Sequence, residues 1–267
     1  NKKIILLSGD IGNKMFDTLK FKRPRQFYNC GVAESNMMSM ASGLGLDGLI
    51  PIVYTITPFT TTRCLEQIKI GVCYHNSPVI IIGTGSGLSY AQLGPTHHSL
   101  EDISIMRSMP NMIVFCPSDP IEVQLGLREA IKINKPVYIR LGKKGEPNIN
   151  SLNKKVISFS KPNCIKKGND VCILATGSII NLALEASEKL KEVDIHTEIY
   201  SYHTIKPINN NFLKKIFERF RLVFTLEEHN YIGGLHSSIA EWLIVNKPEL
   251  APKLKRFSME DKFYSEV

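Results

Sequence analysis

The chain has 267 residues, of which 43% are hydrophobic and 22% are charged. These proportions are typical of a globular protein of one or two domains with a substantial core, and no stretch reaches the roughly 18 consecutive apolar residues of a membrane span. The net charge of +8 suits an anionic substrate or partner, but the basic residues are spread along the chain. Neither nucleic acid nor a membrane is therefore an expected partner.

The six cysteines show no Cys-x-x-Cys spacing, and several lie inside apolar runs that are typical of strands. They are Cys30, Cys64, Cys73, Cys116, Cys164 and Cys172. Buried, reduced thiols fit this pattern better than disulfides or metal ligands do. Reduced thiols in turn favour a cytoplasmic protein.

Short runs rich in β-branched residues recur through the first half of the chain. They are KIILL from Lys3, PIVY from Pro51, VIIIG from Val79, MIVF from Met112 and VYIRL from Val137. Amphipathic stretches that are predicted to be helical separate several of them, such as RCLEQIKIGVC from Arg63 and IEVQLGLREAIKI from Ile121. This alternation predicts an α/β fold with a mostly parallel sheet covered by helices.

The segment from about Asn148 to Asn169 has little helical pattern and is rich in Lys, Ser, Asn and Pro, so it is predicted to be a linker. The alternation then resumes with the strand VCILA, the helix NLALEASEKLKEV, the strand HTEIYS, the helix NFLKKIFERF, the strand LVFTLEE and a helix that follows Gly233-Gly234. We therefore expect two α/β domains, residues 1–160 and 161–267, each with a mostly parallel sheet covered by helices.

The segment FYNCGVAESNM is the first that indicates chemistry. It is predicted to be an apolar strand that runs through Gly31 into Glu34, and Glu34 is the only acid between Gly31 and Asp47. An ionised carboxylate there would lose water without an evident cation, which is energetically costly. Glu34 therefore either faces solvent at a helix start, where an acid suits the helix dipole, or it has a function that needs a carboxyl group with a shifted pKa.

Two further segments stand out from the scaffold. TITPFTTTRCLEQIK places Phe59 in a polar turn before a helix, and GTGSGLSYAQLGPTHHSLEDISIMRSMPNM is a long Gly-rich loop that carries His97 and His98. A lone Phe59 would more often be a packing residue. The histidines have no HExxH spacing, and the loop has neither GxGxxG nor the P-loop pattern, so metal binding and generic nucleotide binding are not favoured.

The order of these segments resembles the C-terminal part of the transketolase family, a pyrimidine-binding domain followed by the transketolase C-terminal domain. GVAESNM resembles the segment with the cofactor-activating glutamate, and GPTHHSLEDISIMRSMPNMIVFCPSDPIE resembles the Thr-His loop with the helix and strand after it. SGDIG from Ser8 resembles the opening strand and acidic turn, and EEHNYIGGLHSSIAE resembles the Glu-His…Gly-Gly segment. The resemblance covers nearly the whole chain.

The resemblance implies transfer of a two-carbon ketol unit between sugars with thiamine diphosphate as cofactor. It implies that Glu34 binds N1′ of the aminopyrimidine ring, where an apolar pocket favours the neutral form of a carboxyl group and so allows a shared proton. It further implies that Phe59 stacks on this ring, that Asp10 lies near the thiazolium, and that His97 contacts the reacting oxygens of the donor.

The site residues expected from the resemblance fall into three groups. The catalytic residues are Glu34 and His97, and the cofactor-binding residues are Asp10, Glu34, Phe59 and Arg63. The substrate-binding residues are Leu93, His97, His98 and Arg140, of which Arg140 would reach the distal phosphate. His98 has no role assigned by the family, and no metal ligand is expected in this chain.

The chain has no Gly-Asp-Gly, the segment with which the family binds the diphosphate through Mg²⁺. The charged end of the cofactor needs a metal to neutralise its phosphates. The chain is therefore either a fragment or one subunit of a split transketolase, and PFTTTRCLEQI favours the second. This interpretation implies a partner, an N-terminal transketolase subunit that holds Mg²⁺, in a heterotetramer with two copies of each chain.

The substrate loop departs from the family pattern at two places. Leu93 stands where the family has an aspartate, and the place of a phosphate-binding histidine falls near Gly85. Both departures predict a specialised sugar rather than a central pentose phosphate. The alternatives are a deoxyxylulose-phosphate-synthase-like enzyme, a 2-oxoacid-dehydrogenase β-like subunit and a non-catalytic assembly module. The Thr-His-His loop argues against the dehydrogenase subunit, and the presence of Glu34 argues against the non-catalytic module.

Overall fold

The computed structural model describes residues 1–11, 14–150 and 157–265, which form two compact units. The first unit comprises Asn1–Ile113 and Ala130–Lys143 together with Ser265, and the second comprises Val114–Glu129 and Lys144–Tyr264. Each unit is built from strands and helices in alternation, so the predicted α/β class is confirmed. The predicted domain boundary at residue 160 stays a prediction.

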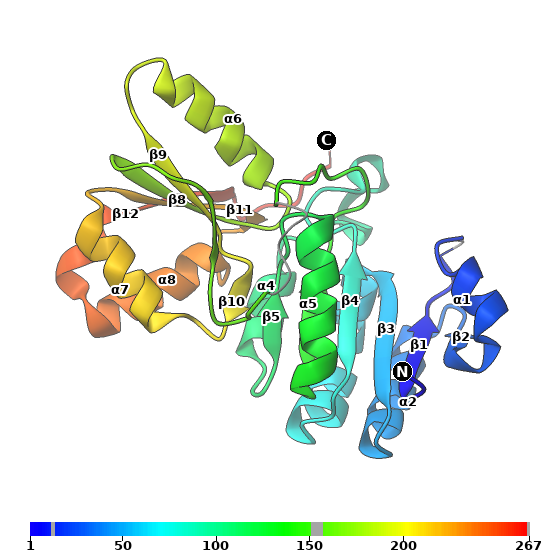
Figure 1. Cartoon of the computed structure of the whole chain (residues 1–267). Helices are drawn as coiled ribbons and strands as arrows, with labels where there is room; N and C mark the ends of the chain where they lie inside the picture. The colour runs from blue at the N-terminus through cyan, green and yellow to red at the C-terminus, as the bar shows by residue number, and fades with distance from the viewer. Residues whose placement is uncertain (12–13, 151–156, 266–267) are drawn as a thin grey trace. The chain divides into compact units, whose positions relative to one another are not determined.

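Five strands of the first unit pair in parallel, in the order β6-β4-β3-β1-β2 (Figure 1). They are β1 (Ile4–Ser8), β2 (Phe27–Asn29), β3 (Ile50–Ile56), β4 (Ile80–Thr84) and β6 (Val137–Arg140). Strands β3 and β4 are buried almost throughout, because a parallel sheet is covered on both faces. Parallel pairing also brings the carboxyl ends of all five strands to one edge of the sheet.

The helices of the first unit follow these strands. They are α1 (Asp17–Lys22), α2 (Glu34–Leu46), α3 (Thr57–Thr60) and α4 (Asp102–Ser108), with 3₁₀ turns η1 (Pro24–Gln26), η2 (Thr62–Cys64) and η4 (Ala91–Thr96) and the π-helix η3 (Gln67–Tyr74). Helix α2 packs against β3 and η3 through the fully buried Met37, Met38 and Ala41. The stretch predicted to be helical from Arg63 is helical, but it winds as η2 followed by η3.

The strand predicted to run through Gly31 is shorter and more exposed than expected. Strand β2 ends at Asn29, and Tyr28 and Asn29 are exposed because β2 is the edge strand of the sheet. Gly31 has a φ of 68°, which turns the chain away from the strand direction and toward α2. The prediction of an apolar strand into Glu34 was therefore wrong.

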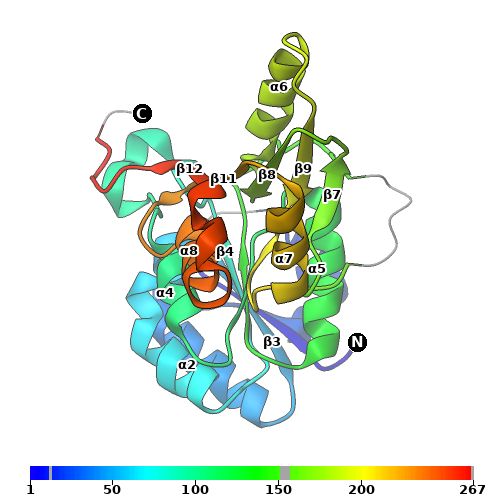
Figure 2. The ribbon, with the colours of Figure 1, turned by 90° about the vertical axis from the view of Figure 1, so that its left-hand side faces the viewer.

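The second unit contains a five-stranded sheet in the order β12-β11-β8-β9-β7, with helices on both of its faces (Figure 2). All its pairs are parallel except that of β7 with β9. In Figure 2, α6 lies on one side of this sheet and α7 and α8 lie on the other. Its strands are β7 (Asn163–Lys166), β8 (Val171–Thr176), β9 (Thr197–Ser201), β11 (Val223–Asn230) and β12 (Leu254–Met259).

The second unit also contains α-helices and a 3₁₀ turn, and it shares one of these helices with the first unit. They are α5 (Pro120–Ile133), which continues into the first unit, α6 (Ile180–Lys191), α7 (Asn210–Arg219), α8 (Leu235–Asn246) and η5 (Pro248–Lys253). A short β10 (Thr204–Lys206) pairs antiparallel with the end of β5 (Ile113–Phe115). Glu227 from the predicted Glu-His…Gly-Gly segment accepts hydrogen bonds from the backbone N–H groups of Leu235 and His236, and so stabilises the start of α8.

Strand β7 lies inside the segment that was predicted to be a linker. Its four residues carry no clear alternation, and their pairing partner is supplied by β9, 30 or more positions away in the chain. The Asn163 side chain also donates a hydrogen bond of 2.5 Å to Glu122. The linker prediction was therefore wrong for Asn163–Lys166, and its residues 151–156 lie outside the described residues.

A buried carboxylate holds residues 114–129 within the second unit. Glu122 is fully buried and accepts hydrogen bonds from the backbone N–H and the hydroxyl of Ser118 and from the hydroxyl of Ser201. Asn163 donates to its other oxygen. A carboxylate with this many donors is well compensated for its loss of water.

Two expectations about the chain as a whole concern thiols and membrane spans. All six cysteines lie in the described part of the chain, and none forms a disulfide bond. Across residues 1–11, 14–150 and 157–265, no helix has both the length and the apolar character needed to cross a membrane.

Two helical glycines predict opposite effects of the same substitution. A Cβ at Gly43 in α2 would meet no atom within 4 Å, whereas a Cβ at Gly126 in α5 would overlap the ring of Phe115. We expect Gly43→Ala to raise the free energy of unfolding by about 0.5–1 kcal/mol through helix propensity. Gly126→Ala should lower it by about 1–3 kcal/mol through overpacking. Urea unfolding followed by circular dichroism measures both, and equal shifts would contradict the packing of Phe115.

Candidate active site

The predicted site residues lie in the loops that leave one edge of the first sheet. Asp10 follows β1, Glu34 follows β2, and Phe59 follows β3. The loop with His97 follows β4, and Arg140 is the last residue of β6. The carboxyl edge of an open parallel sheet is the usual place for a ligand in α/β proteins. The topology therefore brings residues far apart in sequence to one edge.

Glu34 begins α2 and is only 5% exposed. Arg63 Nη1 donates a hydrogen bond of 2.8 Å to Glu34 Oε2, while the Arg63 side chain remains 44% exposed. The guanidinium carbon lies 4.1 Å from the centroid of the Phe59 ring. The solvent-facing alternative for Glu34 is therefore wrong, and so is the expectation that its carboxylate lacks a cation.

The chain around Arg63 is held by short-range contacts. Ser35 Oγ donates to the backbone oxygen of Arg63 at 3.1 Å, and the Cys64 thiol lies 3.2 Å from the backbone oxygen of Phe59. Burial raises the pKa of Cys64 to about 11, so this thiol stays protonated and serves as a donor rather than a nucleophile. These contacts fix the turn that presents Phe59 and Arg63 beside Glu34.

Three rings form a row beside Arg63, the partner of Glu34. The His97 ring lies 5.3 Å from the Phe59 ring and 5.8 Å from the Tyr90 ring, measured between centroids. We call Phe59, His97 and Tyr90 the ring row. A cation lies at each end of it, because Arg63 covers Phe59 and Lys143 Nζ lies 4.6 Å from the Tyr90 centroid. His97 Nδ1 shares a hydrogen bond of 2.9 Å with Thr96 Oγ1.

His98 does not join the ring row. It is buried, and its Nε2 lies 2.8 Å from the backbone oxygen of Ala91, so it stabilises the turn η4. The two adjacent histidines therefore have separate surroundings, and the substrate-binding role expected for His98 stays a prediction. Within the described ranges, no group of three or more His, Cys, Asp and Glu side chains is placed to hold a metal ion.

Arg140 is buried in an internal ion pair. Its Nε donates 2.8 Å to Asp102 Oδ2, and its Nη2 donates 3.2 Å to the backbone oxygen of Ser99. The hydroxyl of Tyr138 donates to the same Asp102 oxygen at 2.6 Å. These contacts occupy much of the guanidinium, so the predicted phosphate contact of Arg140 stays a prediction. Sequence reasoning missed Asp102, because its partners lie 36 and 38 positions away.

In the described part of the chain, neither the Asp10 nor the Leu93 side chain forms a hydrogen bond with Glu34, Arg63 or the ring row, and each residue has partners of its own. Asp10 Oδ1 accepts 3.2 Å from Asn29 Nδ2, and Asp10 lines a hollow of about 230 Å³ at the carboxyl ends of β1 and β2. Leu93 is 53% exposed, and its backbone N–H donates to Tyr90 within η4. The roles expected of Asp10 near the cofactor and of Leu93 toward the substrate stay predictions.

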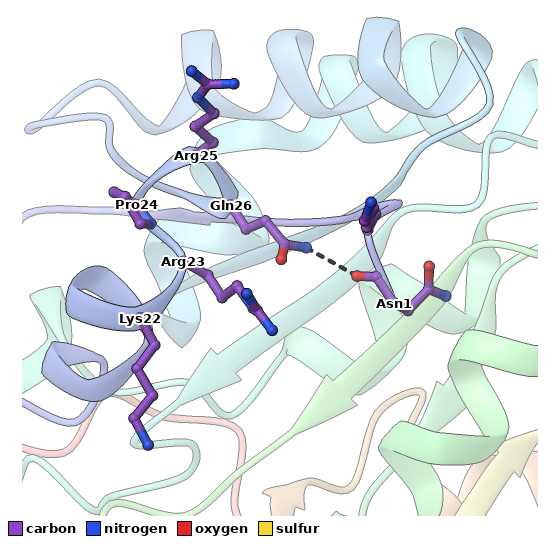
Figure 3. A pocket seen from close by; sticks show the side chains of 7 residues that line it. Asn1, Lys22, Arg23, Pro24, Arg25 and Gln26 are labelled. Atoms are coloured by element: carbon purple, nitrogen blue, oxygen red, sulfur yellow. Dashed lines mark hydrogen bonds between the residues drawn. The ribbon is translucent and has the colours of Figure 1, made fainter.

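A second hollow, of about 550 Å³, lies at the opposite, amino ends of β1 and β2 (Figure 3). Its lining is basic and includes Lys2, Lys22, Arg23 and Arg25. Figure 3 shows Gln26 directed toward Asn1, to which it donates a hydrogen bond of 2.9 Å, while Lys22 and Arg25 point in different directions. The cations do not converge on one point, so this hollow is not a candidate active site.

Known proteins match the chain along nearly its whole length. Residues 1–147 match the model of the transketolase pyrimidine-binding domain, and residues 160–261 match the model of the transketolase C-terminal domain. The chain is 33% identical over 242 residues to an apulose-4-phosphate transketolase subunit of Actinobacillus succinogenes, a match that covers 91% of this chain and 77% of that protein. It is 35% identical over 240 residues to a 6-deoxy-6-sulfo-D-fructose transketolase subunit of a Clostridium species, covering 90% and 73%.

A solved structure described as a split gene transketolase in an inactive β4 tetramer has a TM-score of 0.88 and 33% identity, covering 98% of this chain and 84% of that one. The chain therefore belongs to the transketolase family. Within it, the chain is a subunit of a split transketolase, and its pyrimidine-binding domain is that of a thiamine diphosphate enzyme. The family expected from the sequence motifs is thereby confirmed.

The pair of Arg63 and Glu34 predicts a measurable coupling. Arg63→Met should lower the free energy of unfolding by about 1–2 kcal/mol, because the buried carboxylate loses its cation but the exposed side of the pair can admit water. Glu34→Gln combined with Arg63→Met should cost about 1 kcal/mol less than the sum of the single changes. Urea unfolding gives the free energy of unfolding of the parent chain, of each single variant and of the double variant.

The control for this cycle is Arg25→Met, which removes an exposed arginine outside the candidate site. It should change the free energy of unfolding by no more than about 0.5 kcal/mol. Equal effects of Arg63→Met and Arg25→Met would show that the buried carboxylate does not depend on Arg63.

Proposed function

We propose that this chain carries the pyrimidine-activating half of a transketolase that transfers a two-carbon ketol unit between sugars. The observation that carries the proposal is the buried Glu34 beside the ring row. A carboxyl group withdrawn from water and next to an aromatic face is suited to exchange a proton with a flat heterocycle. His97 lies in the same row, 5.3 Å from Phe59, where a substrate bound beside that heterocycle would meet it.

The residues present fit the aminopyrimidine ring of thiamine diphosphate. The guanidinium of Arg63 is a flat group with N–H donors, and it lies over Phe59 while it donates to Glu34. An aminopyrimidine is likewise flat, can be protonated and carries N–H donors, so the same two side chains can hold it. When bound, thiamine diphosphate supplies a thiazolium that acts as an electron sink.

The side chains of this chain would divide the work as follows. Glu34 holds and moves the proton at N1′, Phe59 orients the ring by stacking, and Arg63 shifts from the carboxylate to the ring's edge. Asp10 follows the strand that begins the sheet and would face the thiazolium. His97, supported by Thr96, would hydrogen-bond the reacting oxygens of the donor.

The diphosphate and Mg²⁺ belong to the partner in this proposal. The printed sequence has no Gly-Asp-Gly, and the relatives whose names describe them as transketolase subunits support an enzyme divided between two chains. We infer an N-terminal subunit with the diphosphate-binding domain, a heterotetramer with two copies of each chain, and a cytoplasmic location. The separate matches of residues 1–147 and 160–261 support a domain boundary near residue 160.

The substrate is proposed to be a specialised sugar, which makes contacts unlike those of the central pentose phosphates. Leu93 offers an exposed apolar side chain where an aspartate would accept a substrate hydroxyl, and Gly85 offers no side chain at all. The named substrates of the two relatives, apulose 4-phosphate and 6-deoxy-6-sulfo-D-fructose, support this choice. No contact described above favours the synthase-like or dehydrogenase-like alternative.

Glu34→Gln tests the proposed role of the carboxyl group. The amide keeps the shape of the side chain but cannot take up the proton, so turnover of the reconstituted two-subunit complex should fall by about 10²–10⁴-fold. Glu66→Gln, at an exposed position nearby, should leave turnover unchanged. A near-normal rate for a folded Glu34→Gln complex would remove this mechanism.

Cofactor binding by the chain alone tests the proposed division between subunits. Without the partner's metal site, the phosphates of the cofactor remain uncompensated, and we expect titration calorimetry with thiamine diphosphate and Mg²⁺ to detect at most weak binding. Addition of the partner chain should tighten the apparent Kd by about a hundredfold or more, because its metal site would neutralise the phosphates. Tight binding by the isolated chain would contradict the division.

A further inference from the structure

The backbone fixes the turn η4, which carries Thr96. Gly94 has a φ of 69° and a ψ of −164°, a conformation that favours glycine. Its carbonyl oxygen accepts a hydrogen bond of 3.0 Å from the N–H of His97, and the N–H of Leu93 donates to the oxygen of Tyr90 at 2.9 Å. The main chain on both sides of Thr96 is therefore held in place.

The hydroxyl group of Thr96 takes part in two hydrogen bonds but has only one hydrogen to donate. Thr96 Oγ1 lies 3.1 Å from the backbone oxygen of Leu93 and 2.9 Å from Nδ1 of His97. A carbonyl oxygen cannot donate, so the hydroxyl hydrogen is used in the bond to Leu93. The hydroxyl oxygen is then the acceptor toward His97, and Nδ1 is the donor. A neutral His97 ring therefore carries its hydrogen on Nδ1.

The other ring nitrogen of His97 has the opposite character. Only one nitrogen of a neutral imidazole carries hydrogen, so Nε2 keeps a lone pair and can only accept. Within the described ranges, no protein group forms a hydrogen bond with this nitrogen. The ring itself lies between Phe59 and Tyr90, at 5.3 and 5.8 Å between centroids. A ligand in the site would thus meet an unpaired acceptor at Nε2.

The adjacent His98 shows the opposite arrangement. Its Nε2 lies 2.8 Å from the backbone oxygen of Ala91, which can only accept, so a neutral His98 carries its hydrogen on Nε2. The two histidines differ because their partners differ. One ring faces a hydroxyl group that already donates elsewhere, and the other faces a carbonyl group. The local hydrogen bonds therefore decide the form of each ring.

We propose that Thr96 is a positioning residue that fixes His97 in the Nδ1–H form and so presents Nε2 to the substrate as the acceptor for a hydroxyl group. This inference rests on the proposed ketol transfer, in which His97 meets the reacting oxygens. If Nε2 takes up the hydroxyl proton, Nδ1–H still donates to Thr96, and the charged ring keeps its place. Half a turn of the ring would lose this bond, so Thr96 also opposes ring rotation.

Nuclear magnetic resonance of the full chain with ¹⁵N-labelled histidine tests this assignment without turnover. Long-range ¹H–¹⁵N spectra at about pH 8.5, where histidine side chains are ordinarily neutral, show which nitrogen carries hydrogen. His97→Gln identifies the signals of His97. We expect His97 mainly in the Nδ1–H form and His98 in the Nε2–H form. A parent chain with His97 mainly in the Nε2–H form would overturn the proposal.

Substitutions of Thr96 separate its hydroxyl group from its shape. Thr96→Val removes the hydroxyl and should shift His97 toward the Nε2–H form, which a histidine side chain without a partner prefers in water. Thr96→Ser keeps the hydroxyl and should retain the Nδ1–H form. Thr18→Val, the same change at an exposed position in α1, should alter neither histidine. If Thr96→Val left the form of His97 unchanged, the hydroxyl would act on the turn alone, as such local contacts often do, and the proposal would fail.

Turnover of the reconstituted two-subunit complex tests the consequence for the reaction. Thr96→Val should lower kcat by about three- to tenfold, the contribution of one hydrogen bond, with a smaller change in KM, because His97 is misplaced for the transition state. Thr96→Ser should restore most of the parent kcat, and Thr18→Val should match the parent. Equal kcat values for Thr96→Val and Thr96→Ser would overturn the positioning role. A parent complex without ketol transfer would count against the proposed function instead, and the spectra would still decide the form of His97.

Discussion

The candidate site depends on one interaction, the hydrogen-bonded ion pair between the buried carboxylate of Glu34 and the half-exposed guanidinium of Arg63. A carboxylate at the start of α2, a helix that buries methionine and alanine, would be costly to bury alone. Arg63 offsets that cost and at the same time covers Phe59. The cation is held at the surface, so a ligand with similar donors can replace it without rebuilding the core.

This pair is possible because the sheet is parallel. Glu34 follows β2 and Arg63 follows β3, and the two strands lie on either side of β1 in the same orientation. Their carboxyl ends therefore deliver both loops to one edge. The long loop after β4 and the end of β6 arrive at the same edge and add His97, Tyr90 and Lys143. The scaffold thus determines which loops meet, and the loops determine the chemistry.

Two cations near the site, Arg140 and Lys143, differ in burial and in whether a carboxylate binds them. Asp102 binds Arg140 inside the unit, together with Tyr138, so this arginine contributes to the architecture of the substrate loop. Lys143 keeps its charge at the surface beside Tyr90. A buried cation with a carboxylate partner stabilises a loop but attracts an anion weakly, whereas an exposed cation over an aromatic face attracts one without that competition. The relatives act on different sugars according to their names, which is consistent with loops that vary on a common sheet.

The sequence by itself determined the α/β class, most strands and helices, the family, and Glu34 as the residue to examine, because hydrophobic periodicity and short motifs are local properties of the chain. The tertiary structure alone decided which of these residues and strands contact one another. Arg63 pairs with Glu34 across 29 positions, Asp102 pairs with Arg140 across 38, and β7 forms only because β9 offers it an edge. Such contacts follow from strand order and register, which no local pattern encodes. The electrostatic surroundings of a single buried carboxylate are therefore set by the cation that this strand order brings next to it.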